Sequence, residues 1–354
     1  METYIVSALK YRPLTFEEVV GQQAITQTLE NAIDKNQLAQ ALLFCGPRGV
    51  GKTSCARILA KKINAQEANN PSEDYAFNIF ELDAASNNSV DDIRNLNEQV
   101  RIPPQVGTHK IYIIDEVHML STAAFNAFLK TLEEPPKHVI FILATTEKQK
   151  IIPTILSRCQ IYDFKRIGIT DCKNHLNTIA IDQNIQFEEE ALNLIAKKAD
   201  GAMRDALSIY DRMVSFSKRN LTVNSVAENL NVLDYDTFFS ITQSILKNDI
   251  PSLLVEFDEL LKEGFDELQF ITGLGSHFRD LMVSKEDKTI HLIDVSKLTK
   301  EKYIQQTSKA SLDLLLNGID LTSKCELDYR NTKNKRLLIE LCLMQLASLH
   351  FEEK

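Results

Sequence analysis

The feature that most constrains this chain is a glycine-rich loop between a short apolar run and a helix-prone segment. The loop reads Gly46-Pro47-Arg48-Gly49-Val50-Gly51-Lys52-Thr53, with residues 41–44 before it and 54–63 after it. It matches the pattern in which backbone N–H groups surround a polyphosphate, the lysine reaches the β- and γ-phosphates and the hydroxyl binds Mg²⁺. A strand–turn–helix with incidental glycines is the alternative, and the match at every fixed position disfavours it. The loop therefore predicts a nucleotide-binding site.

Composition places the chain among ordinary globular proteins. With 354 residues, 44% apolar and 25% charged, it has room for roughly two or three domains. The first ten residues are not a secretory signal and no apolar run approaches the ~20 residues that span a bilayer, so we expect a cytoplasmic protein with no membrane partner. The cysteines lack CxxC or metal-ligand spacing, so we expect them to be reduced and in or near the core. They are Cys45, Cys55, Cys159, Cys172, Cys325 and Cys342.

The charge balance is acidic. The chain carries 40 basic and 49 acidic residues, a formal net charge of −9. A protein that attracts nucleic acid through its overall field is more often basic. If this chain contacts DNA, we expect a local surface or a larger assembly to do so.

Apolar runs alternate with helical patterns over the first half of the chain. Continuous runs occur at residues 41–44, 110–114 and 139–143, and residues 78–82 resemble a short strand. Continuous rather than alternating hydrophobicity is typical of strands buried on both faces of a parallel sheet. Helical spacing separates these runs, with Ser89 and Ser121 placed as N-caps, whereas residues 11–22 are irregular and residues 64–74 form an exposed connection. The pattern predicts a doubly wound α/β domain with its ligand site at the carboxyl ends of the strands.

From Thr170 onward the sequence shows only helical periods. Three helices at 171–181, 189–199 and 202–216 form a small unit, and the polar stretch 217–221 reads as a linker. Further helices are expected at 238–246, 253–261, 268–282, 311–321 and 336–349. We therefore divide the chain into domains at residues 1–166, 167–221 and 222–354.

Two carboxylates follow the run at 110–114. Asp115 is expected near the Mg²⁺ that Thr53 binds, and Glu116 is expected to orient or deprotonate a water, because an NTPase must handle both. A solvated turn is the alternative for such a pair. His118 is interpreted as a packing or turn residue rather than a ligand. Thr146, at the tip of the neighbouring strand, is a candidate hydrogen-bond donor to the γ-phosphate or to that water.

Two arginines are candidates for contact with the γ-phosphate. Arg158 follows the α/β region, and Arg204 opens a helix of the small unit. An arginine supplied to a γ-phosphate accelerates hydrolysis by ~10³ to 10⁵, so an arginine from another domain or subunit makes hydrolysis depend on assembly. Surface ion pairs worth ~0–1 kcal/mol each are the alternative, and spacing alone leaves both open.

Eight strings, in order over residues 10–208, resemble the AAA+ clamp-loader ATPases, specifically the gamma/tau family of bacterial DNA polymerase III. They are KYRPLTFEEVVGQ, GPRGVGKTS, ELDAASNNSVDDIR, YIIDEVHMLS, FNAFLKTLEEPP, FILATTE, ILSRCQ and GAMRDALS. The later helices resemble the collar of that family. The resemblance implies an AAA+ P-loop ATPase domain, a three-helix lid and an all-α collar for oligomerisation.

The resemblance also implies roles for single residues. The ATP-binding Walker A loop comprises Gly46, Pro47, Arg48, Gly49, Val50, Gly51, Lys52, Thr53 and Ser54. Asp115 and Glu116 are the Walker B pair, with Thr53 and Asp115 holding Mg²⁺. Thr146 is sensor 1, Arg204 is sensor 2 of the same subunit, and Arg158 is the arginine finger offered to the neighbour's ATP. The residues against the base and ribose are Tyr11, Arg12, Pro13, Val19 and Val20.

Partners follow from the same resemblance. They are the delta and delta-prime subunits, further gamma/tau copies, the sliding clamp and primer–template DNA. Asn87, Asn88 and Ser89, at a helix N-terminus, would face DNA phosphate, which agrees with the chemistry of helix ends. Most members carry a four-cysteine zinc module before the DAAS segment, but residues 64–80 contain no cysteine, so we expect no zinc. The chain ends at Lys354, just past the collar, before any tau-type extension.

We interpret the chain as an ATP-dependent motor subunit that loads the sliding clamp during DNA replication. A non-hydrolysing structural subunit is the alternative within the family, but such subunits lose the P-loop residues that are present here. Another AAA+ DNA-remodelling ATPase would share the ATPase core but not Ser157-Arg158-Cys159 followed by a collar. A helicase with a DExH motif would need a second α/β motor domain, which the helical patterns after Thr170 disfavour.

Overall fold

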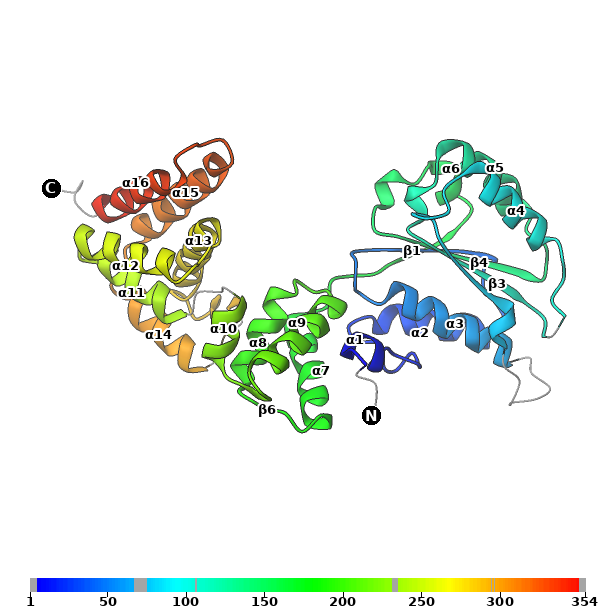
Figure 1. Ribbon diagram of the computed structural model, residues 1–354, viewed down its shortest axis with the longest axis horizontal. Coiled ribbons are helices and arrows are strands. Elements are labelled where there is room, and N and C mark those ends of the chain that lie inside the picture. Colours follow the sequence, from blue (N-terminus) through cyan, green and yellow to red (C-terminus); the bar gives the residue numbers. More distant parts are fainter. Residues whose placement is uncertain are drawn as a thin grey trace. The chain divides into compact units, whose positions relative to one another are not determined.

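A computed structural model of the chain describes residues 5–66, 75–105, 107–230, 235–293, 295 and 297–349. The predicted connection at 64–74 thus lies largely outside the described residues. The chain divides into two compact units, Met1–Gln183 with Ile195–Arg212, and Asn184–Leu194 with Met213–Lys354 (Figure 1). Within the part of the chain that is described, no helix has both the length and the apolar content of a membrane span.

The first unit is built on a parallel five-stranded sheet with the order β2-β3-β4-β1-β5. The strands are β1 (Ala41–Cys45), β2 (Ile79–Asp83), β3 (Lys110–Asp115), β4 (Val139–Thr145) and β5 (Gln160–Asp163). Every residue of β1 and β4 is buried, as their uninterrupted apolar runs predict. The register pairs Cys45 with Thr145 and Asp83 with Asp115, so the carboxyl ends of neighbouring strands meet at one edge.

Alternate strand residues point to opposite faces of the sheet and fill two separate cores. On one face, Phe44 packs with Leu59 of α3 (Lys52–Gln66), beside α2 (Gln23–Asp34). On the other face, Phe141 packs with Phe128 of α5 (Thr122–Glu133), beside α4 (Val90–Val100) and α6 (Pro153–Leu156). Figure 1 shows these helices covering the two faces. The interior strand β1, between β4 and β5, is therefore packed on both faces, which positions the loop that follows it.

The predicted helix caps are present. Ser89 accepts a hydrogen bond from the backbone N–H of Asp92 and forms a capping box with it at the start of α4. Ser121 likewise caps α5 through the N–H of Ala124. The remaining elements of this unit are α1 (Ser7–Lys10), α7 (Ile169–Asp182), the end of α8 (Glu189–Lys198), the first part of α9 (Met203–Phe216), and the 3₁₀ turns η1 (Tyr75–Asn78), η2 (Val117–Met119) and η3 (Lys148–Lys150).

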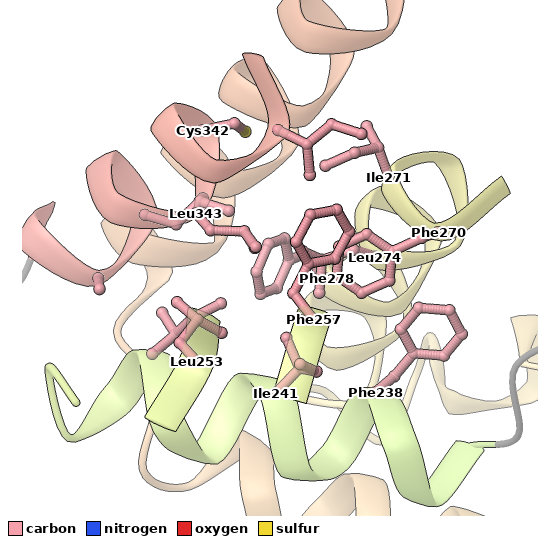
Figure 2. Close-up of a cluster of buried hydrophobic side chains, with 14 of the residues drawn as sticks. Phe238, Ile241, Leu253, Phe257, Phe270, Ile271, Leu274, Phe278, Cys342 and Leu343 are labelled. Atoms are coloured by element: carbon pink, nitrogen blue, oxygen red, sulfur yellow. The ribbon is translucent and has the colours of Figure 1, made fainter. Parts of the chain in front are cut away.

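The second unit is almost entirely helical. Its elements are β6 (Gln186–Phe187), the start of α8 (Glu189–Lys198), the end of α9, β7 (Asn220–Leu221), α10 (Val223–Leu230), α11 (Tyr235–Leu246), α12 (Ile250–Lys262), α13 (Glu267–Val283), η4 (Ile290–Leu292), α14 (Lys297–Thr307), α15 (Leu312–Tyr329) and α16 (Lys335–Ser348). Its core gathers aromatic and aliphatic side chains of six of these helices, α11 to α16. Figure 2 shows Phe257, Phe270, Phe278 and Leu343 converging at its centre.

Glycines let the helices of this core approach closely. A Cβ added at Gly318 of α15 would lie 2.9 Å from Cδ2 of Phe278 on α13. A Cβ added at Gly275 of α13 would lie 2.8 Å from Oγ1 of Thr322 on α15. Phe278 and Thr322 are both buried, so neither can move aside into solvent. The contact between α13 and α15 therefore depends on glycine at both positions.

A buried polar chain crosses the same unit. His277, 2% exposed, lies with Nδ1 3.0 Å from the Tyr303 hydroxyl and Nε2 3.1 Å from Oε1 of Gln306. The Gln306 amide nitrogen donates to the carbonyl oxygen of Phe239 at 2.8 Å, so its oxygen must accept from His277. His277 is thus neutral with its proton on Nε2, and Nδ1 accepts from Tyr303. Burial lowers the pKa of His277 to about 4.

Several details differ from the sequence predictions. Residues 217–221 are not simply a linker, because residues 220–221 form β7 and pair with β6, and Leu221 is fully buried. Two-residue strands carry no periodicity that a sequence could reveal. Helices α10 and α14 were missed, and α15 extends eight residues beyond the predicted end at Leu321. The prediction for the cysteines is confirmed: all six are free, and all but Cys159 are buried.

Candidate nucleotide-binding site

A cavity of about 1080 Å³ opens in the first unit at the carboxyl edge of the sheet. Its walls come from the loop after β1, the ends of β2 and β3, the segment before α2, and helices α7 and α9. The α/β pattern predicts a ligand site at this edge. Many of the predicted site residues line this cavity.

The glycine-rich loop adopts a backbone that only glycine accommodates easily. Gly46, Gly49 and Gly51 have φ values of 147°, 74° and 105°. A Cβ at Gly46 would lie 2.4 Å from the carbonyl oxygen of Phe164, just after β5. A Cβ at Gly49 would lie 3.3 Å from the Cβ of Arg204. The loop is therefore packed between the end of the sheet and the start of α9. Its residues in the cavity wall are Arg48, Gly49, Val50, Gly51, Lys52, Thr53 and Ser54, whereas Gly46 and Pro47 are not part of the wall.

Lys52 lies inside this loop. Its side chain is buried, and Nζ donates to the carbonyl oxygens of Gly46 and Pro47, both at 2.7 Å. Burial lowers the pKa of Lys52, and the carboxylates of Glu116 and Asp115 oppose that shift. The nearby carboxylates favour the charged form of Lys52, and its two hydrogen bonds go to neutral carbonyl oxygens, which a phosphate could replace.

Thr53 and Asp115 meet as predicted. The Thr53 hydroxyl donates to Oδ2 of Asp115 at 2.8 Å, and both residues line the cavity. A hydroxyl and a carboxylate are the hard oxygen donors that Mg²⁺ prefers, with phosphate and water completing its shell. This donor set fits a nucleotide-bound Mg²⁺.

Glu116 is held in an unusual backbone conformation. Its φ of 48° and ψ of 44° lie in the left-handed region, which is uncommon for a residue other than glycine. Its Oε2 accepts hydrogen bonds from the hydroxyl and N–H of Thr146, at 3.0 and 3.3 Å. Thr146 itself is not part of the cavity wall. The two residues predicted to manage the water are therefore joined to each other.

His118 lies in the turn η2, as its interpretation as a packing or turn residue requires. The structure adds three contacts that the sequence did not reveal, and the first joins Nδ1 to Oγ1 of Thr145 at 3.1 Å. Its Nδ1 is 3.4 Å from Oε2 of Glu116, and its Nε2 is 3.3 Å from Oε1 of Glu147. The ring is nearly buried and is not part of the cavity wall, so it contacts Glu116 without lining the cavity itself.

The two candidate arginines differ in position. Arg204 lines the cavity, and its backbone N–H donates to the carbonyl oxygen of Gly49 at 3.4 Å. Arg158 is not part of the cavity wall. Its guanidinium pairs with Glu133 at 2.5 Å and donates to the carbonyl oxygen of Thr154 at 2.6 Å. The sequence left two roles open for Arg158, contact with a γ-phosphate or a surface ion pair. Within one chain, Arg158 makes the surface ion pair.

The residues expected against a base and ribose all reach the cavity wall. They are Tyr11, Arg12, Pro13, Val19 and Val20. The pKa of Arg12 is lowered, mainly by burial and to a smaller extent by repulsion from Arg57. The same wall contains Leu9, His175, Leu207 and Asp211, which sequence reasoning missed. Those from α7 and α9 reach the cavity only through tertiary folding, and no local motif marks them.

The segment predicted to face DNA lies outside the cavity wall, at the start of α4. The Asn87 amide donates to the carbonyl oxygen of Asp83 at 3.0 Å, and Asn88 and Ser89 are exposed. The first turn also carries Asp91 and Asp92, whose carboxylates already satisfy the positive helix end. Contact between this segment and DNA stays a prediction.

Comparison with known proteins identifies the family. A profile described as DNA polymerase III, delta subunit, matches residues 21–168, and one described as DNA polymerase III clamp loader subunit, ATPase lid domain, matches residues 171–219. The DNA polymerase III subunit gamma of Buchnera aphidicola is 35% identical over 324 residues, which cover 87% of this chain and 85% of that protein. The chain belongs to the DNA polymerase III gamma/tau family.

Longer members of the gamma/tau family are similarly close. The tau subunit of Bacillus subtilis is 39% identical over 95% of this chain but only 62% of its own length. The tau subunit of Escherichia coli is 33% identical over 98% of this chain and 56% of its own length. The chain thus spans little more than half the length of these tau relatives.

A solved structure supports the fold alone. The Holliday junction branch migration motor RuvB of Thermotoga maritima matches with a TM-score of 0.51 at 20% identity, over 72% of this chain and 89% of that one. Together with the lid profile and the parallel sheet, this confirms the predicted fold class of an α/β P-loop domain followed by a lid and a helical region. Nucleotide binding follows from membership of this family of ATPases.

Proposed function

We propose that this chain is an ATP-hydrolysing motor subunit of a bacterial clamp loader, which places a sliding clamp on primer–template DNA during replication. The observation that carries the proposal is the cavity in which Lys52, the Thr53–Asp115 pair and Arg204 meet while Arg158 lies elsewhere. Such a site binds a nucleotide in one chain but is completed by a second. Its partners would be further gamma/tau copies and the delta and delta-prime subunits.

Lys52, Thr53 and Asp115 would hold the triphosphate and its Mg²⁺. The Lys52 ammonium exchanges its two carbonyl contacts for phosphate oxygens, which bind it more strongly because they are charged. Thr53 and Asp115 would supply oxygen ligands to the metal. Mg²⁺ neutralises charge on the β- and γ-phosphates when bound.

Glu116 and Thr146 would handle the attacking water. The carboxylate that now accepts from the Thr146 hydroxyl and N–H is the group that would orient or deprotonate water. Thr146 holds Glu116 in one orientation, and the hydroxyl is the group that would turn toward the γ-phosphate. Both roles stay predictions.

The two arginines would act on different nucleotides. Arg204 lines the cavity of its own chain and would contact the γ-phosphate there as sensor 2. Arg158 would leave its exposed pair with Glu133 and reach the ATP of a neighbouring subunit as an arginine finger. Hydrolysis would then depend on assembly around DNA and clamp, and it would release both.

Two substitutions separate binding from hydrolysis. Lys52→Ala is expected to abolish ATP binding, because the main positive charge of the loop is lost. Arg158→Ala is expected to leave ATP affinity within about twofold and to lower DNA- and clamp-stimulated hydrolysis of the reconstituted loader by ~10³. Equilibrium titration with a fluorescent ATP analogue and a phosphate-release assay measure the two effects.

The matched control is Arg279→Ala, which removes an exposed arginine with a comparable ion pair to Asp280 in the second unit. It should hydrolyse ATP as the wild type does. Normal stimulated hydrolysis by the Arg158→Ala loader would refute the interfacial mechanism. Loss of ATP binding in Arg158→Ala would instead mean that the arginine serves its own chain.

The alternative functions retain specific tests. A structural, non-hydrolysing subunit would show no turnover in any reconstituted complex, although Lys52, Thr53, Asp115 and Glu116 argue against it. Another DNA-remodelling ATPase of this fold would be stimulated by DNA without a clamp. The proposal includes the domain division at 1–166, 167–221 and 222–354. It also includes the expectation of no bound zinc, which metal analysis of the purified protein would check.

A further inference from the structure

The N-terminal segment, residues 7–11, is hydrogen-bonded to helices α7 and α9, which come more than 150 residues later in the chain. The backbone N–H of Ser7 donates to Oδ2 of Asp211 at 2.7 Å, and the Ser7 hydroxyl donates to Oδ1 at 2.5 Å. Ser7 opens α1, whose own N-cap residue Val6 offers no side-chain hydrogen bond. A carboxylate 204 residues later in the chain therefore caps this short helix.

The same serine is held from a second helix. The amide of Gln183, the residue after α7, donates to the Ser7 hydroxyl at 3.3 Å. The hydroxyl of Tyr210 on α9 donates in turn to Oε1 of Gln183 at 3.3 Å. Ser7 is 2% exposed, so these contacts are shielded from water. Shielding makes a charge-assisted hydrogen bond stronger than one at the surface.

A second anchor lies four residues further on. The hydroxyl of Tyr11 donates to Oδ2 of Asp182, the last residue of α7, at 2.5 Å. Nζ of Lys10 lies 3.5 Å from the same oxygen. The Tyr11 hydrogen bond lowers the pKa of Asp182, so this carboxylate is charged at neutral pH. The two anchors bracket the segment between residues 7 and 11.

Both anchors border the cavity. Tyr11 and Asp211 belong to its wall, as do Ala8 and Leu9 between the two anchor points. Asp211 and Arg204 are seven residues apart on α9, about two helical turns, and so lie on the same face of that helix. The helix that presents Arg204 at the phosphate end thus also holds the segment at the other end of the cavity.

We propose that Asp182 and Asp211 are positioning residues that clasp the N-terminal segment to α7 and α9 and thereby build the base-and-ribose half of the nucleotide site. This inference rests on the proposed function, since it assumes that the cavity binds ATP. The clasp joins the wall that faces the base to the helix that carries Arg204. A nucleotide that orders one therefore orders the other.

The consequence is a division of the binding energy between two halves of the cavity. The loop at residues 46–54 holds phosphates without help from the clasp, whereas contacts to base and ribose require it. Inorganic tripolyphosphate and ATP, each with Mg²⁺, separate these halves because only ATP reaches the clasped wall. Loss of the clasp should weaken ATP binding and leave tripolyphosphate binding unchanged.

The test compares Asp211→Asn, Asp182→Asn and the double variant with the wild-type chain. Calorimetric titration should show ATP affinity about tenfold weaker in Asp211→Asn and weaker again in the double variant, with tripolyphosphate affinity within twofold of wild type. Hydrogen exchange of residues 5–12 should be faster in the variants. Asp205→Asn is the matched control, an exposed carboxylate on α9 outside the cavity wall.

The outcomes are distinct. Equal weakening of ATP and tripolyphosphate would show that Asp211 serves overall stability and would overturn the clasp. Unchanged ATP affinity in the double variant would overturn it as well. If Asp211→Asn does not fold, Ser7→Ala takes its place. It removes only the hydroxyl, so it should weaken ATP binding to a smaller degree and leave tripolyphosphate binding unchanged. A wild-type chain that binds neither ligand would contradict the proposed function itself.

Discussion

Burial changes the chemistry of single ionisable residues in both units, with opposite consequences. Lys52 is buried among carbonyl groups, yet the carboxylates of Asp115 and Glu116 favour its charged form. His277 is buried against Tyr303 and Gln306 with no carboxylate among its hydrogen-bond partners. The first residue is therefore available to an anion, and the second is a neutral hydrogen-bond bridge.

The pKa of His277 predicts how stability depends on pH. Because its pKa is about 4 in the folded chain and about 6.5 in an unfolded one, the stability it supports is complete above pH 6.5. Between pH 6.5 and 4 the unfolded chain binds a proton that the folded chain does not. The free energy of unfolding should fall by about 3 kcal/mol over that range and then level off for this group.

Urea denaturation of the full chain at a series of pH values measures this fall. Other groups titrate in the same window, so the relevant quantity is the difference between wild type and His277→Gln, which has no titrating ring. The variant should be less stable at pH 7.5 and should lose less stability on acidification. Parallel pH profiles for the two proteins would contradict the assignment.

Among the elements, the contact between α13 and α15 shows how closely packed the second unit is. Gly318→Ala would place a methyl group against the fully buried ring of Phe278. Overpacking costs about 1–3 kcal/mol, whereas alanine gains up to about 1 kcal/mol over glycine in a helix. We expect a net loss of about 1–2 kcal/mol in the free energy of unfolding.

Thermal and urea denaturation of Gly318→Ala measure the loss. Ser323→Ala is the control, since Ser323 is exposed on the same helix and the change should alter stability by no more than about 0.5 kcal/mol. A Gly318→Ala chain more stable than wild type would mean that Phe278 moves aside without cost.

Sequence reasoning succeeded where one short stretch determines the structure by itself. Continuous apolar runs located the central strands, and the loop before Lys52 located the phosphate side of the cavity. Sequence reasoning failed where the structure of a segment depends on another part of the chain that packs against it. Residues 220–221 form a strand only because β6 lies beside them, α14 has too little apolar periodicity to recognise, and Asp211 reaches the cavity through the packing of α9.

For the whole molecule, the two units imply that assembly and nucleotide binding are separable. All wall residues of the cavity belong to the first unit, whereas the proposed collar belongs to the second. The net charge of −9 also disfavours strong DNA binding by an isolated chain. We expect DNA to bind only after several chains combine their local surfaces.

Assembly should therefore survive the loss of nucleotide binding. A Lys52→Ala chain at micromolar concentration should sediment as the same oligomer as the wild type, with or without ATP, because the substituted residue lies outside the collar. Analytical ultracentrifugation of both chains measures this. A Lys52→Ala monomer, where wild type with ATP forms oligomers, would place the assembly contacts under nucleotide control.

The placement of the six cysteines has a practical consequence for fluorescence labelling. Five of them are at most 4% exposed, and burial raises the pKa of the partly exposed Cys159 to about 11. At pH 7.5 Cys159 is therefore almost entirely in the thiol form, and the thiolate is the form that attacks a maleimide. A dye attached to one introduced, exposed cysteine would therefore report from that position alone, with all six native thiols left in place.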